Sequence, residues 1–382
     1  MNNKKIIFLD KASTTEVYRD FFEYIIKHKD KSIGNPSSIH TLGQNSRSFL
    51  ESQRRKICKI LNISTYQLIF TSGSTEGNNL IIQQNFDYYI TTNTSHSSIW
   101  NPILKKYKNK LIICPNKRGE PLLDKAKEFA QKLLKFKVLW IFEHVNSTTG
   151  FICNTNKIIK AIKSIAPDHK ILIDETQAIC KIKVLSYNFG ADYCTFSGHK
   201  FKSIKGIGGI IFNLNSIEDF ETNMIGGGQE FNRRAGTENI IGISSMFVAF
   251  RNKYKNFQKN KTKIMVLDQY FMKEIVKRNL SVLTFDLNRL PGIFNINYDN
   301  ISKIRNDLLC IKLNENNICV SPGSACSSGS LTQNRIINNI LETKNFRQHI
   351  RVSFDEENSI EELKTFWKEF DKIILNSHEH RN

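Results

Sequence analysis

The stretch Ile171-Leu172-Ile173-Asp174 decides the fold, because three apolar residues in a row end in a carboxylate. A short apolar run of this kind is typical of a buried strand in a parallel sheet. Runs with a similar pattern occur at Tyr66–Phe70, Tyr88–Thr92, Leu111–Cys114, Val138–Phe142, Tyr193–Phe196 and Gly208–Phe212. Helical patterns lie between them at Ser46–Leu61, Leu122–Leu134 and Asn156–Ile165. This alternation predicts an α/β protein with a mostly parallel central sheet and helices on both faces.

The pattern changes around Phe250. Two long helical patterns are followed by short strands and a last helix, at Ile240–Phe257, Lys261–Arg278, Ile293–Asn297, Ile318–Val320, Ile350–Phe354 and Ile360–Leu375. Ser359 and Glu362 form a capping box at the start of that last helix. A chain of 382 residues exceeds the usual size of one core. We therefore expect a large α/β domain over 15–255 and a smaller α+β domain over 1–14 and 256–382.

The composition narrows the class of protein. The net charge is +19, with 55 basic residues spread along the whole chain rather than clustered. Direct nucleic-acid binding is therefore not favoured, although an acidic or tRNA-handling partner protein would be attracted over long range. The apolar runs are too short to span a membrane, and the first residues do not resemble a signal peptide, so we expect a cytoplasmic protein. Eight cysteines without a C-x-x-C pair give no reason to expect a metal site.

Two residues at predicted strand ends suggest a carbonyl cofactor. Lys200 closes Ser197-Gly198-His199-Lys200, and lysine is the amine that forms Schiff bases. Asp174 would suit a pyridinium nitrogen, the partner that pyridoxal phosphate requires, and Gln177 could donate to the phenolate oxygen of that cofactor. The alternatives are a surface lysine at position 200 and a structural hydrogen bond or helix cap at position 174. Ligands bind at such strand ends in open α/β sheets.

Two further segments fit the same cofactor. Phe70–Asn79 contains two glycines and several hydroxyls between a strand and a helical run, which is typical of an anion site at a helix start. Ser197 and His199 could add donors to a phosphate there, whereas the alternative is an ordinary capped helix. His96 follows the strand at Tyr88–Thr92 and could lie over an aromatic ring, although a loop histidine is the simpler interpretation.

These residues belong to a longer series of motifs. The series runs Leu9–Thr15, Gly34–His40, Phe70–Asn79, Asp174–Gln177, Ser197–Lys200, Gly226–Glu230, Arg233–Asn239, Gly323–Cys326 and Arg351–Ser353. In this order the motifs resemble those of cysteine desulfurases of the NifS/IscS type, within the class-V aminotransferase group of fold-type-I pyridoxal-phosphate enzymes. The resemblance covers nearly the whole chain.

The resemblance implies a role for each matching residue. Lys200 would bind pyridoxal 5'-phosphate covalently and then move protons, Asp174 and Gln177 would contact its ring, and His96 would stack on it. Thr75, Ser197 and His199 would bind the phosphate, together with Thr237 from the partner subunit of a homodimer. Asn35, Asn146 and Arg351 would hold the carboxylate and neighbouring groups of L-cysteine, and Asn146 would also lie at the cofactor. An arginine suits a carboxylate because its fork binds both oxygens.

Cys326 lies in a Gly- and Ser-rich stretch, Ser321–Thr332, that is typical of a loop. A loop can carry a thiolate, the nucleophilic form of cysteine, into a site and out to an acceptor. The resemblance implies that Cys326 takes the substrate's sulfur as a persulfide, whereas an isolated cysteine there would more simply be an incidental thiol. The expected partners are sulfur acceptors, namely an iron–sulfur scaffold, tRNA-thiolation enzymes, or both.

One segment departs from the family pattern. Asn146 is kept, but Ser147 and Thr148 stand where the family often has Asn and Glu. Because of this difference, the resemblance does not predict the exact positions of the groups that this segment places near the cofactor. Two other functions stay open at this point: an aminotransferase or selenocysteine lyase of the same fold, and a basic scaffold protein without catalysis. Cys326 argues against transamination, and Lys200 with Asp174 argues against a scaffold.

Overall fold

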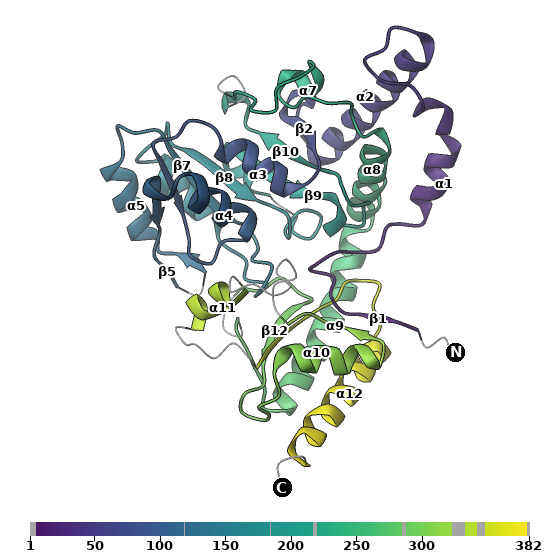
Figure 1. Cartoon of the computed structure of the whole chain (residues 1–382), viewed down its shortest axis with the longest axis vertical. Coiled ribbons are helices and arrows are strands. Elements are labelled where there is room, and N and C mark those ends of the chain that lie inside the picture. Colours follow the sequence, from purple (N-terminus) through teal and green to yellow (C-terminus); the bar gives the residue numbers. More distant parts are fainter. Residues whose placement is uncertain are drawn as a thin grey trace.

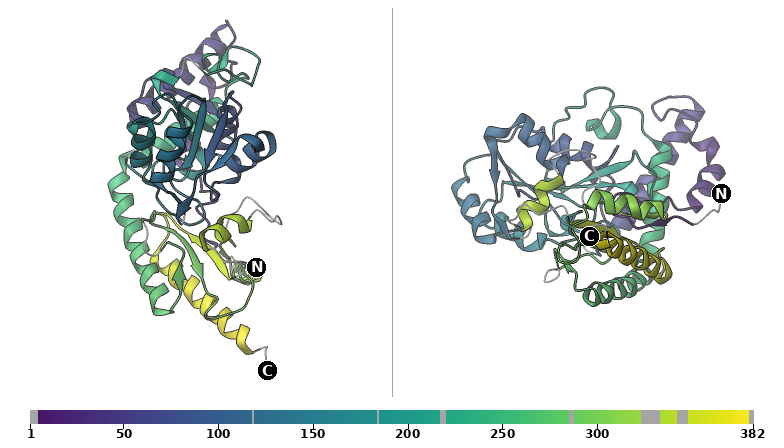
Figure 2. Two further views of the ribbon diagram at one scale, coloured as in Figure 1. Left: turned by 90° about the vertical axis from the view of Figure 1, so that its left-hand side faces the viewer. Right: turned by 60° about the horizontal axis from the view of Figure 1, so that its bottom comes forward.

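The computed structural model describes residues 5–117, 119–183, 185–216, 220–284, 288–322, 333–341 and 348–379. Figure 1 shows one lobe built around a large sheet and a second lobe that contains β12, α10 and α12. Helices α8 (Ile240–Lys255) and α9 (Phe257–Lys277) follow each other almost without interruption. Figure 2 shows α9 as a long green helix that extends from the first lobe along the second.

The central sheet confirms the expected mostly parallel architecture. In the described part of the chain it has seven strands in the order β2-β10-β9-β8-β7-β3-β4. These strands are β2 (Leu68–Thr71), β3 (Tyr88–Thr91), β4 (Leu111–Ile113), β7 (Val138–Glu143), β8 (Lys170–Asp174), β9 (Tyr193–Ser197) and β10 (Gly208–Phe212). Strand β10 is antiparallel to both of its neighbours, β2 and β9, whereas the other described pairs of this sheet are parallel. It follows β9 after a connection too short for a crossover helix.

Alternating side chains explain why helices cover both faces of this sheet. Trp140 and Phe142 of β7 pack on one face, and Leu139 and Ile141 pack on the other. The first face is covered by α2 (Thr41–Leu61), α5 (Leu123–Lys132), α6 (Thr155–Lys163) and α8. The second face is covered by α3 (Ser74–Ile82) and α4 (Ser97–Lys106). Strands buried on both faces read as continuous apolar runs, which is the pattern of the sequence.

The second lobe has its own core. Its antiparallel sheet consists of β11 (Ser281–Val282), β12 (Ile293–Asn297) and β14 (His349–Ser353). Near it lie α9, α10 (Asn306–Glu315), α12 (Ile360–Glu379) and the parallel pair of β1 (Ile7–Phe8) with β13 (Ile318–Cys319). Phe271, Phe294 and Trp367 are buried at its centre. The expected capping box is confirmed, because Glu362 N donates to Ser359 Oγ and Ser359 N donates to the Glu362 carboxylate.

The remaining elements are short. They are α1 (Asp20–Lys27), α7 (Gln229–Asn232), α11 (Gln333–Leu341) and the hairpin of β5 (Asn116–Lys117) and β6 (Glu120–Pro121). Among the residues that the structure describes, none of the helices is both long enough and apolar enough to cross a lipid bilayer.

Candidate active site

A cavity of about 140 Å³ lies where β7, β8 and β9 end, between the central sheet and residues of the second lobe. It brings together eight of the residues expected from the sequence, namely Thr75, His96, Asp174, Gln177, Ser197, His199, Lys200 and Arg351. Asp174 is the last residue of β8 and Ser197 is the last residue of β9. Parallel strands therefore place these groups at a common edge of the sheet, as expected for a binding site in this architecture.

Lys200 reaches across the cavity to the N-terminal segment. Its Nζ donates to the main-chain oxygens of Ala12, at 2.7 Å, and Ser13, at 2.6 Å. Gln177 makes a similar contact, because its Nε2 donates to Ala12 O at 2.7 Å. A lysine amine held by neutral carbonyls at the wall of a cavity is available to a carbonyl compound that enters it.

Asp174 is nearly fully buried and is held by neutral donors. Asn78 Nδ2 donates to Asp174 Oδ2 at 3.0 Å, and Thr176 N donates to Asp174 Oδ1 at 2.9 Å. Asn78 is itself fixed, since its Oδ1 accepts a hydrogen bond from Thr195 Oγ1 at 2.6 Å. These bonds orient the carboxylate without neutralising it, so that a cationic group in the cavity would be stabilised.

The start of α3 lies against the end of β9. Ser74 N donates to Ser197 Oγ at 2.8 Å, and Ser197 Oγ donates to Ser74 Oγ at 3.0 Å. A Cβ atom at Gly73 would lie 3.1 Å from Ser197 Oγ, which explains why a glycine opens this helix. The positive end of α3 and the nearby hydroxyl groups form a place for an anion, as the sequence predicts.

The two histidines of the cavity differ in surroundings. Burial lowers the pKa of His199 to about 4, and the positive charge of Lys200 acts in the same direction, so the ring is neutral at pH 7. His199 Nδ1 contacts Thr14 Oγ1 at 3.1 Å. His96 caps α4, where Ser98 N donates to its Nδ1 at 3.1 Å. This bond makes Nδ1 an acceptor and leaves Nε2 as the ring's protonated nitrogen in the neutral form.

Arg351 enters the cavity from β14 of the second lobe. Its Nη2 donates to Asp10 Oδ1 at 2.7 Å and to Ser13 Oγ at 2.6 Å, and its Nη1 donates to Ser147 O at 3.0 Å. The side chain is almost completely buried. A guanidinium held in this way is oriented before any ligand arrives.

Comparison with known proteins identifies the family. The family described as "Aminotransferase class-V" matches residues 7–366. A protein named "Cysteine desulfurase IscS" from Dictyoglomus turgidum is 31% identical over 350 residues, which cover 88% of this chain and 86% of that protein. The chain belongs to the class-V aminotransferase family. Within it the chain is a cysteine desulfurase, so the expected enzyme class and pyridoxal-phosphate dependence are both confirmed.

Solved structures agree with this assignment. A NifS-like protein from Rickettsia africae superimposes with a TM-score of 0.84 and is 28% identical, and the match covers 97% of this chain and 100% of that one. Another NifS-like protein gives a TM-score of 0.87 over 97% of this chain and 99% of the other, at 23% identity, and supports the fold alone. The predicted fold class of the desulfurase is therefore confirmed.

The cavity residues fit the cofactor of this family. Asp174 offers a buried negative charge, Lys200 offers an amine, and the start of α3 offers an anion site. These three groups match the ring nitrogen, the aldehyde and the phosphate of pyridoxal phosphate.

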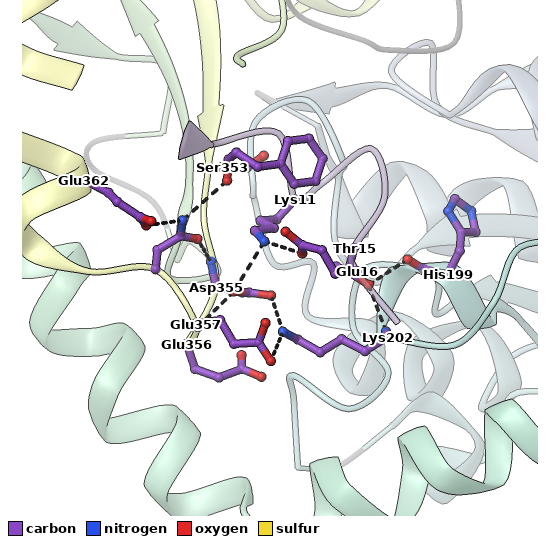
Figure 3. Close-up of polar contacts among 12 residues, drawn as sticks. Lys11, Thr15, Glu16, His199, Lys202, Ser353, Asp355, Glu356, Glu357 and Glu362 are labelled. Carbon is purple, nitrogen blue, oxygen red and sulfur yellow. Dashed lines mark hydrogen bonds and ion pairs between the residues drawn. The ribbon is translucent and has the colours of Figure 1, made fainter. Parts of the chain in front are cut away.

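A network of ion pairs connects this cavity to the second lobe (Figure 3). Lys202 Nζ lies 3.1 Å from Asp355 Oδ2 and 2.7 Å from Glu357 Oε1, just beyond the end of β14. Lys202 N also donates to Thr15 Oγ1, which in turn donates to His199 O. In addition, Lys11 N donates to Ser353 O. The N-terminal segment therefore lies between the end of β14 and the turn that carries Lys200.

Four of the residues expected from the sequence do not line this cavity. Asn35 is exposed and accepts a hydrogen bond from Ser37 N. Asn146 lines a much smaller neighbouring cavity, and its amide donates to Glu143. Thr237, which the family resemblance assigns to the partner's site, is exposed. Cys326 lies outside the described residues.

Other residues in or beside the cavity were not expected from the sequence. Glu143 is the last residue of β7 and faces the cavity, and Ser13 and Asp10 hold Arg351. Glu143 follows an apolar run directly, as Asp174 does. The pattern that indicated Asp174 could therefore also have indicated Glu143. The roles of Asp10 and Ser13 depend on contacts between the two ends of the chain, which no local pattern indicates.

Proposed function

We propose that this desulfurase converts L-cysteine to L-alanine and retains the sulfur atom as a persulfide on Cys326. The observation that supports this most directly is the meeting of Lys200, Asp174 and Arg351 in one cavity. An amine, a buried carboxylate and an oriented guanidinium are the groups required to hold a carbonyl cofactor and an amino acid carboxylate together.

We assign a separate role to each side chain of this site. Bound pyridoxal phosphate supplies an electron sink when the Cα proton of cysteine leaves. Asp174 would hold the proton on the ring nitrogen, and Lys200 would bind the cofactor and remove the Cα proton as a positioned base. Arg351 would bind the substrate carboxylate through its fork, and His96 would contact the ring. Thr75, Ser197 and His199 would bind the phosphate.

Cys326 would complete the reaction as the nucleophile. Its thiolate attacks the sulfur of the substrate, the Cβ–S bond breaks, and the electron pair of that bond goes to Cβ, which takes up a proton. The products are alanine and an enzyme persulfide. The pKa values of Cys58, Cys114, Cys153, Cys180, Cys194, Cys310 and Cys319 are all raised by burial. These seven thiols are therefore poor nucleophiles, which favours Cys326 by comparison.

Mass spectrometry after mixing the holoenzyme with cysteine tests this proposal. We expect one added sulfur atom on the peptide that contains Cys326, together with released alanine. Cys326→Ser should abolish both the added sulfur and sustained alanine formation. Cys319→Ser is the matched control, because Cys319 is only partly buried yet has a raised pKa, and should behave as the wild type. Normal sulfide production by Cys326→Ser would contradict the role of this thiol.

The proposal also covers the oligomeric state, the domain division and the sulfur acceptor. We infer a homodimer in which the exposed Thr237 contacts the phosphate site of the partner subunit, with Asn35 and Asn146 near the substrate. We also infer the division into a large domain over 15–255 and a smaller domain over 1–14 and 256–382, with Cys326 belonging to the smaller one. The persulfide would pass to an iron–sulfur scaffold, to tRNA-thiolation enzymes, or to both, in the cytoplasm. Light scattering of wild type and Thr237→Ala would test the dimer, and persulfide transfer to a purified scaffold would test the acceptor.

A further inference from the structure

Glu143 gives the cavity a second carboxyl group beside Asp174. The two residues end neighbouring parallel strands, β7 and β8, where they are directly paired. Paired residues on adjacent strands point to the same side of the sheet, so both carboxyl groups face the cavity, which they both line. Asp174 already accounts for the negative charge that the ring nitrogen requires, so Glu143 needs a separate explanation.

The hydrogen bonds of Glu143 connect two segments of the site. Glu143 Oε2 accepts from His96 N at 3.2 Å and from Asn146 Nδ2 at 3.2 Å. His96 is the N-cap residue of α4, and Asn146 lies in the loop after β7, where Ser147 and Thr148 depart from the family pattern. Asn146 Oδ1 in turn accepts from Thr148 N and Thr149 N. One carboxyl oxygen therefore fixes both the histidine and this loop.

The surroundings of Glu143 oppose a full negative charge on it. Burial raises the pKa of Glu143 to about 7, and the charge of Asp174 acts in the same direction, whereas His96 and Arg335 of α11 oppose them. Cys153 lines the small neighbouring cavity together with Glu143, and burial, followed by the charges of Glu120 and Glu143, raises the pKa of that thiol. Two like charges at adjacent strand ends repel each other, and Glu143, whose pKa burial raises despite His96 and Arg335, is the carboxyl group expected to keep its proton.

We propose that Glu143 is a further positioning residue of the desulfurase reaction. It holds His96 and Asn146 through one carboxyl oxygen, and because Glu143 keeps its proton, no second negative charge is added to the cavity beside Asp174. The inference rests on the proposed function. Loss of the Glu143 proton at higher pH would add a second negative charge to the cavity and disturb this arrangement.

Two substitutions distinguish the effect of the hydrogen bonds that Glu143 accepts from the effect of its ionisable proton. Glu143→Gln keeps the acceptor oxygen and is neutral at every pH, whereas Glu143→Leu removes both. Glu128→Gln is the matched control, because Glu128 is a carboxylate on the surface of α5 that pairs with Lys125 and Lys132. The kcat/KM for cysteine of each holoenzyme should be measured from about pH 5.5 to 8.5.

The ratio of kcat/KM between wild type and Glu143→Gln should fall about tenfold from about pH 6 to 8, as expected for a proton lost near pH 7. Other groups that titrate in this range are shared by both proteins and cancel from the ratio. Glu143→Leu should lose activity at every pH, and Glu128→Gln should follow the wild type. A ratio that is independent of pH would overturn the proposal.

Thermal unfolding gives a readout that does not depend on turnover. A carboxyl group whose pKa is raised in the folded state loses its stabilising contribution as the pH rises through that pKa. The unfolding midpoint of Glu143→Gln should therefore rise relative to the wild type from about pH 5 to 8. A constant difference would overturn the proposal. If the wild type forms no alanine at any pH, the proposed function fails, while this comparison still tests the proton on Glu143.

Discussion

Arg351 Nη2 lies 2.7 Å from Asp10 Oδ1, although 341 positions separate the two residues in the chain. Ser13 Oγ accepts from the same nitrogen, and Nη1 donates to Ser147 O. The guanidinium is thus oriented by contacts from both lobes. We therefore expect Arg351 to bind the proposed substrate carboxylate without any rearrangement of β14.

We predict that Arg351→Lys raises the KM for cysteine. A lysine ammonium is a point charge that cannot reproduce the fork, so at least one charge-assisted hydrogen bond is lost, which corresponds to about 10- to 100-fold. Steady-state kinetics with alanine detection measures this change. Arg289→Lys is the control, because Arg289 forms a similar ion pair with Asp268 away from the cavity. An unchanged KM would show that Arg351 does not bind the substrate.

We predict that Lys200→Ala binds pyridoxal phosphate without forming a covalent link. The cavity keeps Asp174 and the start of α3, but it loses the amine that reacts with the aldehyde. Borohydride reduction followed by mass spectrometry should leave the cofactor on the wild type and not on the variant. Lys170→Ala, altered at the opposite end of β8, should behave as the wild type. Retention of the cofactor by reduced Lys200→Ala would mean that another lysine forms the bond.

We predict that Glu230→Ala strongly destabilises the fold. Glu230 Oε1 lies 2.6 Å from Arg54 Nη2, and both side chains are almost completely buried. Removal of the glutamate takes the only nearly fully buried carboxylate among the described partners away from this guanidinium and leaves it with Glu51 and Leu68 O, which costs about 3–5 kcal/mol. The other carboxylate that contacts Arg54 is Glu51, which is partly exposed, so Glu51→Ala should cost about 1 kcal/mol or less. Urea unfolding of both variants measures the free energies, and equal losses would contradict the prediction.

We predict that Asp355 contributes to stability above pH 4 and not at strongly acidic pH. The Asp355 carboxylate is buried, which opposes ionisation, but Lys202 and Lys11 outweigh this and lower its pKa from 3.8 to about 2. Because the pKa is depressed in the folded state, the contribution of about 2 kcal/mol is present above the unfolded value. It is lost as the pH falls through the folded value.

Acid unfolding of wild type and Asp355→Asn checks this prediction. The stability difference between the two proteins should be largest near neutral pH and should shrink between about pH 4 and 2. Asp168→Asn, at a position away from this network, is the control for the substitution itself. A stability difference between wild type and Asp355→Asn that did not change with pH would contradict the prediction. It would mean that Lys202 does not stabilise the charged form of Asp355.

The sequence predicted the central sheet and much of the site for the same reason. Buried parallel strands are continuous apolar runs, and the residues that follow them meet at one edge, as Asp174 and Lys200 do. Helices were less predictable: α1, α4 and α10 have only 8, 10 and 10 residues, so that each offers few turns of pattern, and α9 begins at Phe257 rather than Lys261. The contacts of Arg351 with Asp10 and Ser13 join distant parts of the chain, so that local patterns could not show them.

The contacts among Asp10, Lys11, Arg351 and Ser353 also determine when catalysis can begin. Translation makes the N-terminal segment before β14, the strand that contains its partners. Lys200 and Asp174 can be in place earlier, but the contacts that fix the carbonyls around Lys200 cannot form until β14 has been synthesised. A chain that stops before β14 would therefore lack a complete site.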